Sequence, residues 1–159
     1  MKQLPLGIIP LLSLLFFLVS KRAFEGAGDD SQLFTIFIGV SNVIAFFIPI
    51  TIFIFYLLTS SIMFNLLDEK MHPGRMAIVI CFSFLPVLVS AGVYLLMLYG
   101  VNPIGLTIPD MRILSHAGWG GFFIILLLMT REEFHLSFFK ATLISLFPTI
   151  LVMGLRSLI

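Results

Sequence analysis

The chain has 159 residues, of which 60% are hydrophobic and 11% charged, and its mean hydropathy is +1.16. Soluble domains carry about 25% charged residues, so an ordinary water-soluble domain is excluded. The formal net charge of +1 gives no electrostatic case for nucleic acid, and the lone cysteine, Cys81, excludes a disulfide framework and a Cys-rich metal site.

The charged residues fall into a few clusters, and the gaps between the clusters predict membrane spans. A hydrocarbon core of about 30 Å needs about 20 apolar residues in a helix. The first expected span is 4–20. Lys21 and Arg22 follow it where a signal peptide would carry small neutral residues, so we expect a retained helix.

The second uncharged stretch, 31–67, is longer than one span requires. One solution is a span over 34–58 that continues to 67 as a helix projecting from the membrane. The other is a re-entrant pair divided at Pro49. Polar residues gather at 59–65, where an emerging helix would meet lipid headgroups, and this favours the projecting helix.

The remaining expected spans are 77–99, 113–129 and 136–153, with the breaker Pro73-Gly74 before the first of them. The sequence thus predicts an all-α polytopic membrane protein, with about five transmembrane helices bundled into a single domain over 1–159.

The distribution of basic residues predicts the orientation. Five spans put five Lys and Arg residues on the side of the N-terminus (2, 70, 75, 131 and 140) and four on the other side (21, 22, 112 and 156). The positive-inside rule then predicts a multi-pass protein of the cell membrane with a cytoplasmic N-terminus.

The polar turns around 68–75 and 131–140 are the candidate surface for contacts with a partner or with headgroups. The candidate residues are Asn65, Asp68, Glu69, Lys70, His72, Arg75, Arg131, Glu132, Glu133, His135 and Lys140. Glu133 and His135 are two residues apart, a spacing that does not share a helix face, so we predict no catalytic or metal site and no cofactor.

Polar side chains inside the expected spans are a second set of candidates. Ser41, Asn42, Thr51 and Ser83 are expected to form hydrogen bonds between helices, or alternatively to line a polar pathway. No charged residue interrupts the first three spans, which argues against a proton relay or a carrier of charged substrates.

The order of several motifs resembles that of a known family. Leu57–Leu67 runs into the turn Pro73–Arg75, Phe82–Pro86 opens the next span, and Trp119 precedes the turn Arg131–Ala141. This order resembles the membrane domain of the Yip (Ypt-interacting protein) family, particularly its short bacterial members. The resemblance implies a five-helix fold and a non-enzymatic partner-binding role, because bacterial relatives are implicated as accessory proteins, some encoded with ABC exporters.

Three functions follow as hypotheses. The first is a non-enzymatic accessory or assembly protein that binds a membrane-protein partner, such as an ABC-type exporter or a trafficking complex, within the lipid bilayer. The second is a small transporter or channel, alone or as a homo-oligomer, lined by Ser41, Asn42, Thr51 and Ser83. The third is an intramembrane enzyme that uses Glu132, Glu133 and His135. We favour the first.

Overall fold

The computed structural model describes residues 7–24, 32–101 and 108–158, and every regular element in them is a helix. This confirms the predicted all-α class. The elements in chain order are α1 (Ile8–Phe24), α2 (Gln32–Leu66), α3 (Pro73–Ser83), α4 (Leu85–Leu98), α5 (Ile108–Glu133) and α6 (Phe138–Leu158).

Within the described residues, three helical stretches are long and apolar enough to cross a membrane: Thr35–Leu66, Pro73–Leu98 and Ile113–Glu133. Phe138–Val152 is a shorter apolar helix. These stretches indicate a membrane-embedded protein. The count of five spans stays a prediction, as does the orientation of the N-terminus.

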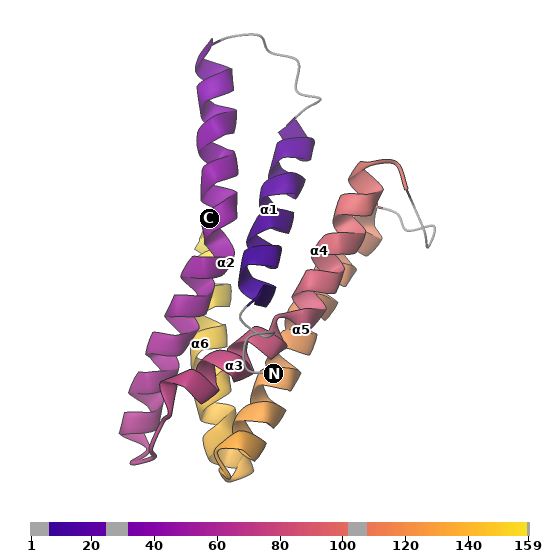
Figure 1. Cartoon of the computed structure of the whole chain (residues 1–159). Helices are drawn as coiled ribbons and strands as arrows, with labels where there is room; N and C mark the ends of the chain where they lie inside the picture. The colour runs from indigo at the N-terminus through magenta and orange to yellow at the C-terminus, as the bar shows by residue number, and fades with distance from the viewer. Residues whose placement is uncertain (1–6, 25–31, 102–107, 159) are drawn as a thin grey trace.

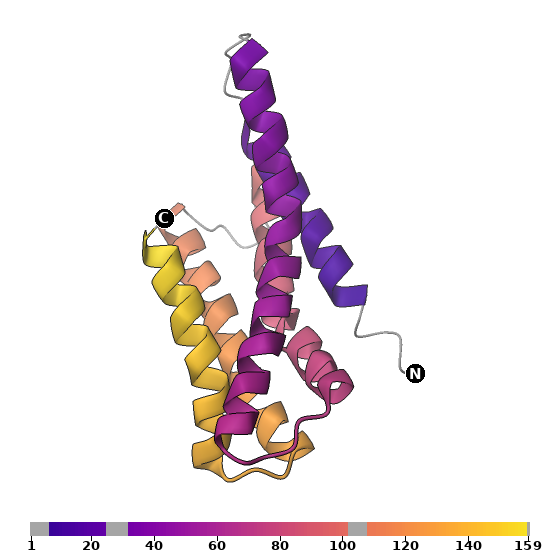
Figure 2. The same ribbon diagram turned by 90° about the vertical axis from the view of Figure 1, so that its left-hand side faces the viewer.

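Apart from α3, which lies across the bundle, the helices run up and down along one long axis (Figure 1). The turn after α2 and the turn between α5 and α6 lie together at the lower end in Figures 1 and 2, and we call this the polar end. The C-terminal ends of α1 and α4 point the opposite way, toward what we call the far end. The N-terminal part of α2 extends beyond the rest of the bundle at the far end (Figure 2).

Helix α2 is continuous over 35 residues, with Pro49 inside it, so it is not divided into a re-entrant pair. Thr59, Ser60 and Phe64 are buried in the bundle, while Asn65 is exposed, and the projection of 59–67 from the membrane stays a prediction. The Thr59 hydroxyl donates to the carbonyl of Phe55 at 2.7 Å. A threonine bonded in this way can be buried, so its presence does not mark a helix that leaves the membrane.

The expected span over 77–99 is two helices that meet at Phe84. Proline has no N–H and its ring clashes with the carbonyl four residues earlier, so Pro86 interrupts the helical hydrogen bonds at Phe82. Helix α3 crosses beneath α1, and α4 then turns toward the far end (Figure 1).

The remaining boundaries differ from the predictions by a few residues. Helix α1 begins at Ile8 and its last turn contains Lys21 and Arg22, while residues 4–6 of the first expected span lie outside the described residues. Helix α5 extends beyond the expected 113–129 at both ends, while α6 begins at Phe138, after the expected 136, and ends at Leu158, beyond the expected 153. A helix can continue into polar sequence when its polar side chains form hydrogen bonds or ion pairs. The positions of uncharged stretches in the sequence do not reveal such contacts.

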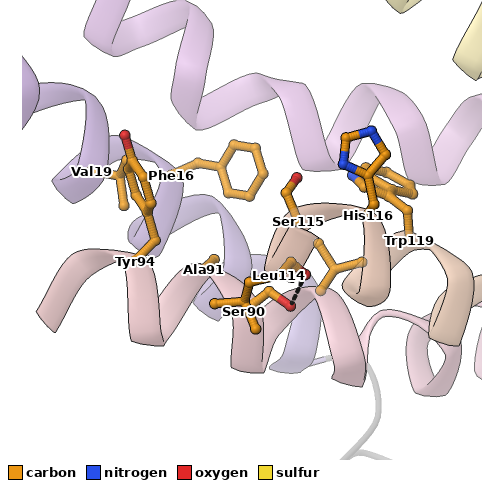
Figure 3. Close-up of a pocket in the computed structure, with 10 residues that line it drawn as sticks. Phe16, Val19, Ser90, Ala91, Tyr94, Leu114, Ser115, His116 and Trp119 are labelled. Carbon is orange, nitrogen blue, oxygen red and sulfur yellow. Dashed lines mark hydrogen bonds between the residues drawn. The ribbon is translucent and has the colours of Figure 1, made fainter. Parts of the chain in front are cut away.

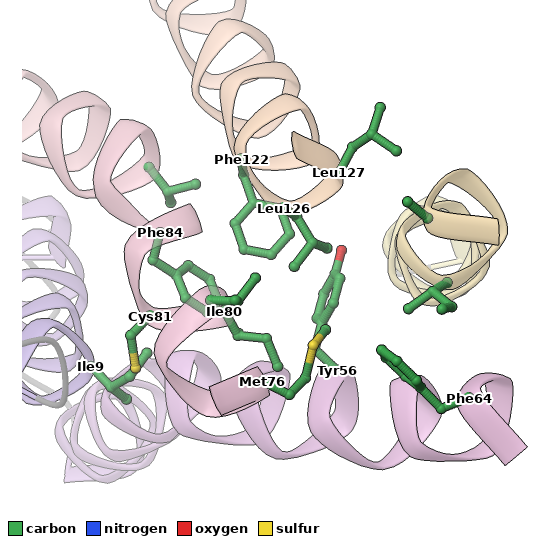
Figure 4. Packing of buried hydrophobic residues seen from close by; sticks show 14 of the residues in the cluster. Ile9, Tyr56, Phe64, Met76, Ile80, Cys81, Phe84, Phe122, Leu126 and Leu127 are labelled. Atoms are coloured by element: carbon green, nitrogen blue, oxygen red, sulfur yellow. The ribbon is translucent and has the colours of Figure 1, made fainter. Parts of the chain in front are cut away.

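The core is densest where α2, α3, α5 and α6 meet, in the half of the bundle nearer the polar end (Figure 4). Phe122 of α5 lies at the centre of this core. The centroid of its ring is 4.9 Å from the ring centroid of Tyr56 and 4.8 Å from that of Phe84. Because α2, α5 and the α3–α4 junction each supply one of these rings, the aromatic contacts fix the three segments against one another.

Candidate functional site

The two turns of the polar end are joined by an ion pair. Glu69 follows α2 and Lys140 lies in the first turn of α6, and Nζ of Lys140 donates to Oε1 of Glu69 at 2.6 Å. Both side chains are about one-third exposed, at 38% for Lys140 and 32% for Glu69. A short, charge-assisted contact between partly buried groups is stronger than a typical surface pair.

A second ion pair connects α3 to α5. Nη1 of Arg75 lies 3.5 Å from Oε1 of Glu133, and the two side chains are 60% and 45% exposed. Water screens a pair of this kind, so it contributes only about 0.2–1 kcal/mol to stability. The importance of this ion pair is its location: Arg75 and Glu133 lie on the same exposed surface as Glu69 and Lys140.

Both turns begin with the same backbone motif. Asp68 and His135 have left-handed φ values of 53° and 52°. After α2, Glu69 N–H donates to the Phe64 carbonyl at 2.9 Å, and after α5, Leu136 N–H donates to the Arg131 carbonyl at 3.0 Å. These are Schellman motifs, in which the left-handed residue is usually glycine. Aspartate and histidine adopt that conformation more readily than most other residues.

Apolar contacts support the polar end from beneath. The rings of Phe64 and Phe134 lie 4.8 Å apart in an edge-to-face arrangement, and Leu136 is buried. The two turns are therefore held by packing, by backbone hydrogen bonds and by ion pairs at once.

The structure brings all eleven predicted contact residues to the polar end, nine of them in or beside its two turns and two, Arg75 and Lys140, in the first turns of α3 and α6. Glu69 and Lys140 are half-buried, and the other nine are exposed: Asn65, Asp68, Lys70, His72, Arg75, Arg131, Glu132, Glu133 and His135. His72, Arg75 and Glu133 line one shallow depression in this surface.

The four polar residues predicted inside the spans have different surroundings. Asn42 is buried and its Oδ1 accepts a 2.7 Å hydrogen bond from the Ser20 hydroxyl, which links α2 to α1. Ser83 is also buried but donates to the Val79 carbonyl of its own helix. Ser41 is half-buried and Thr51 is exposed. A line of four side chains along one pathway therefore does not form in the single chain.

Sequence reasoning missed another polar link between helices. The Tyr56 hydroxyl of α2 donates to Thr149 Oγ1 of α6 at 3.0 Å, and the Thr149 hydroxyl donates to the Ser145 carbonyl at 2.7 Å. The four-residue spacing of Ser145 and Thr149 is a weak signal of a shared face on α6. That Tyr56 of α2 is the hydrogen-bond partner of Thr149 is known only from the three-dimensional structure.

Helices α4 and α5 approach closely because of two glycines. A Cβ atom at Gly121 would lie 2.9 Å from Cβ of Pro86, and one at Gly118 would lie 2.5 Å from the Ser90 hydroxyl oxygen. Small residues allow such approaches between membrane helices. The two small residues of α5 at this interface are Gly118 and Gly121.

Among residues 7–24, 32–101 and 108–158, no group of three or more His, Cys, Asp or Glu side chains is placed to hold a metal ion. Comparisons with protein-family models, with curated proteins and with solved structures give no match. The resemblance to the Yip family therefore stays a prediction that rests on the motifs alone.

Proposed function

We propose that this chain is a membrane-embedded accessory protein that binds a partner membrane protein through the polar end. The observation that carries the proposal is the joining of two turns, distant in sequence, by the Glu69–Lys140 and Arg75–Glu133 ion pairs. Together they form one charged surface at one end of the bundle. Ordered charge of both signs suits the recognition of a complementary protein surface.

The role of this surface is docking rather than chemistry. Glu133 and Arg75 pair on the exposed surface, and mixed charges of this kind suit the recognition of a protein surface. Partner binding needs only the exposed charges of the polar end and no chemical change in them. A partner such as an exporter subunit would add its own charged residues around this surface.

Recovery of the partner from native membranes tests this function. The full chain is crosslinked in the membranes of its own cells, extracted in mild detergent and captured, and co-recovered proteins are identified by mass spectrometry. The proposal expects one membrane protein in a fixed ratio to this chain. Recovery of this chain only, as a defined oligomer that conducts solute in liposomes, would instead support the transporter or channel hypothesis.

A further inference from the structure

A groove lies between three helices in the half of the molecule nearer the far end. Its floor is α4, with Val87, Ser90, Ala91 and Tyr94, and its walls are α1 and α5. Within the described residues α1 and α5 each pack on α4 but do not contact each other. The space left between them is a half-open cavity of about 400 Å³, which is the size of a typical small-molecule pocket.

The lining of this groove is mostly apolar, and its polar members include Ser90 of α4 and Ser115 and His116 of α5. Phe16 and Val19 face Tyr94 at one end, while Trp119 lies at the other end (Figure 3). The Ser90 hydroxyl contacts the carbonyl oxygens of Pro86 at 2.9 Å and Leu114 at 3.2 Å, so it is already satisfied by backbone. The floor and walls therefore favour a hydrocarbon chain over a polar solute.

Positive charge lies beyond the end of the groove marked by Val19 and Tyr94. The next turn of α1 carries Lys21 and Arg22, and the guanidinium of Arg22 is 5.0 Å from the centre of the Tyr99 ring. Its Nε atom donates to the Leu98 carbonyl at 3.4 Å. One end of an apolar groove thus opens toward two basic residues.

The hydrogen bond from Ser20 to Asn42 shows which part of α2 lies beside these basic residues of α1. Because α1 and α2 run antiparallel (Figure 1), Arg22 lies near the level of Val40. From Val40 to Leu66 a helix rises about 40 Å, which matches a bilayer of about 40–45 Å with its headgroups. Lys21 and Arg22 then stand at headgroup level, and the groove lies just inside the hydrocarbon.

We propose that the groove between α1, α4 and α5 binds an anionic phospholipid. One acyl chain lies over Ala91 toward Trp119, and the phosphate of the headgroup lies beside Lys21 and Arg22. The proposal is independent of the partner-binding function, since it concerns the other half of the molecule. Acidic headgroups are attracted by basic residues at the membrane surface, and each such residue contributes about a fivefold preference.

Trp119 is the single tryptophan of the chain and lines the groove, so its fluorescence reports on the occupant. The full chain is placed in liposomes that contain brominated phosphatidylglycerol or brominated phosphatidylcholine, since bromine quenches tryptophan on contact. We expect at least about a fivefold apparent preference of the quenching site for the anionic lipid. Equal quenching by both lipids would overturn the proposal.

Two variants separate the groove from the lipid that surrounds any membrane protein. Ala91→Leu fills the floor and is expected to reduce quenching by both lipids. Its control, Val89→Leu, changes an exposed position on the opposite face of α4 and is expected to leave quenching unchanged. Ala91→Leu protein that keeps its helix content and elution volume but is quenched as strongly as wild type would contradict a lipid in the groove.

The charge is tested in the same way. Lys21→Gln is expected to lower the preference for phosphatidylglycerol by about fivefold. Lys70→Gln removes another exposed lysine, at the polar end, so the preference should stay at the wild-type value. An unchanged preference in Lys21→Gln, or an equal loss in both variants, would show that no headgroup is recognised beside the groove.

Discussion

Nζ of Lys140 lies 2.6 Å from Oε1 of Glu69, across a sequence separation of 71 residues. This contact joins the start of α6 to the turn after α2 and makes one surface from two turns. A double-mutant cycle with Glu69→Gln and Lys140→Met is expected to give a coupling energy of about 0.5–1 kcal/mol in unfolding experiments in detergent. Additive effects of the two substitutions would contradict the pairing.

Lys70 is the control for that experiment, because it is an exposed lysine beside Glu69 in the same turn. Lys70→Met combined with Glu69→Gln is expected to give no measurable coupling. Coupling of similar size in both cycles would mean that general charge at the polar end, rather than the specific contact, is responsible.

The left-handed turn residues predict a gain of stability on substitution. His135 has a φ of 52°, where a Cβ atom is unfavourable, so His135→Gly is expected to stabilise the protein by about 0.5–1 kcal/mol. His72 has a φ of −98°, and His72→Gly at that position should bring no gain. Thermal unfolding of the two variants in the same detergent makes the comparison. A loss of stability in His135→Gly would show that the histidine side chain contributes more than its backbone conformation costs.

The α4–α5 contact predicts opposite effects at neighbouring glycines. A Cβ at Gly121 would meet the Pro86 ring at 2.9 Å, whereas a Cβ at Gly120 would meet nothing within 4 Å. Gly121→Ala is therefore expected to cost about 1–3 kcal/mol, while Gly120→Ala should be neutral or gain up to about 1 kcal/mol in helix propensity. Equal unfolding energies for the two variants would contradict the packing of α4 on α5.

The hydrogen bond between Tyr56 and Thr149 makes a smaller contribution. Hydrogen bonds between membrane helices contribute about 0.6 kcal/mol on average, so Tyr56→Phe is expected to lose about that much stability. In a Thr149→Val background the same substitution should cost nearly nothing, since the partner is already absent. An equal cost in both backgrounds would assign the effect to packing around the ring.

The sequence allowed the helical class and the approximate helix positions to be predicted, because charged residues are excluded from a hydrocarbon core. It also allowed the eleven polar-end residues to be named, since they occupy the two charged turns. Their arrangement could not be predicted. The contact of Glu69 with Lys140 depends on how α6 packs against α2, and no spacing in the sequence encodes that packing.

Two local features were beyond sequence reasoning. Thr59 is polar, yet its hydroxyl bonds its own helix and the residue is buried, so the polar residues at 59–65 do not by themselves show where α2 leaves the membrane. The stretch 77–99 was expected to be one span, whereas the chain forms two helices there that meet at Phe84, just before Pro86. Pro49 lies inside a continuous helix, so proline alone does not predict where a membrane helix divides.

The most direct test of the central claim is site-specific photocrosslinking in native membranes. A photoreactive residue is placed at Glu132, an exposed position of the polar end, or at Lys21, an exposed position near the far end. The account predicts a crosslink from position 132 to one membrane protein, weakened by Arg131→Glu, and no crosslink to that protein from position 21. A partner captured from position 21 and not from position 132 would contradict docking at the polar end.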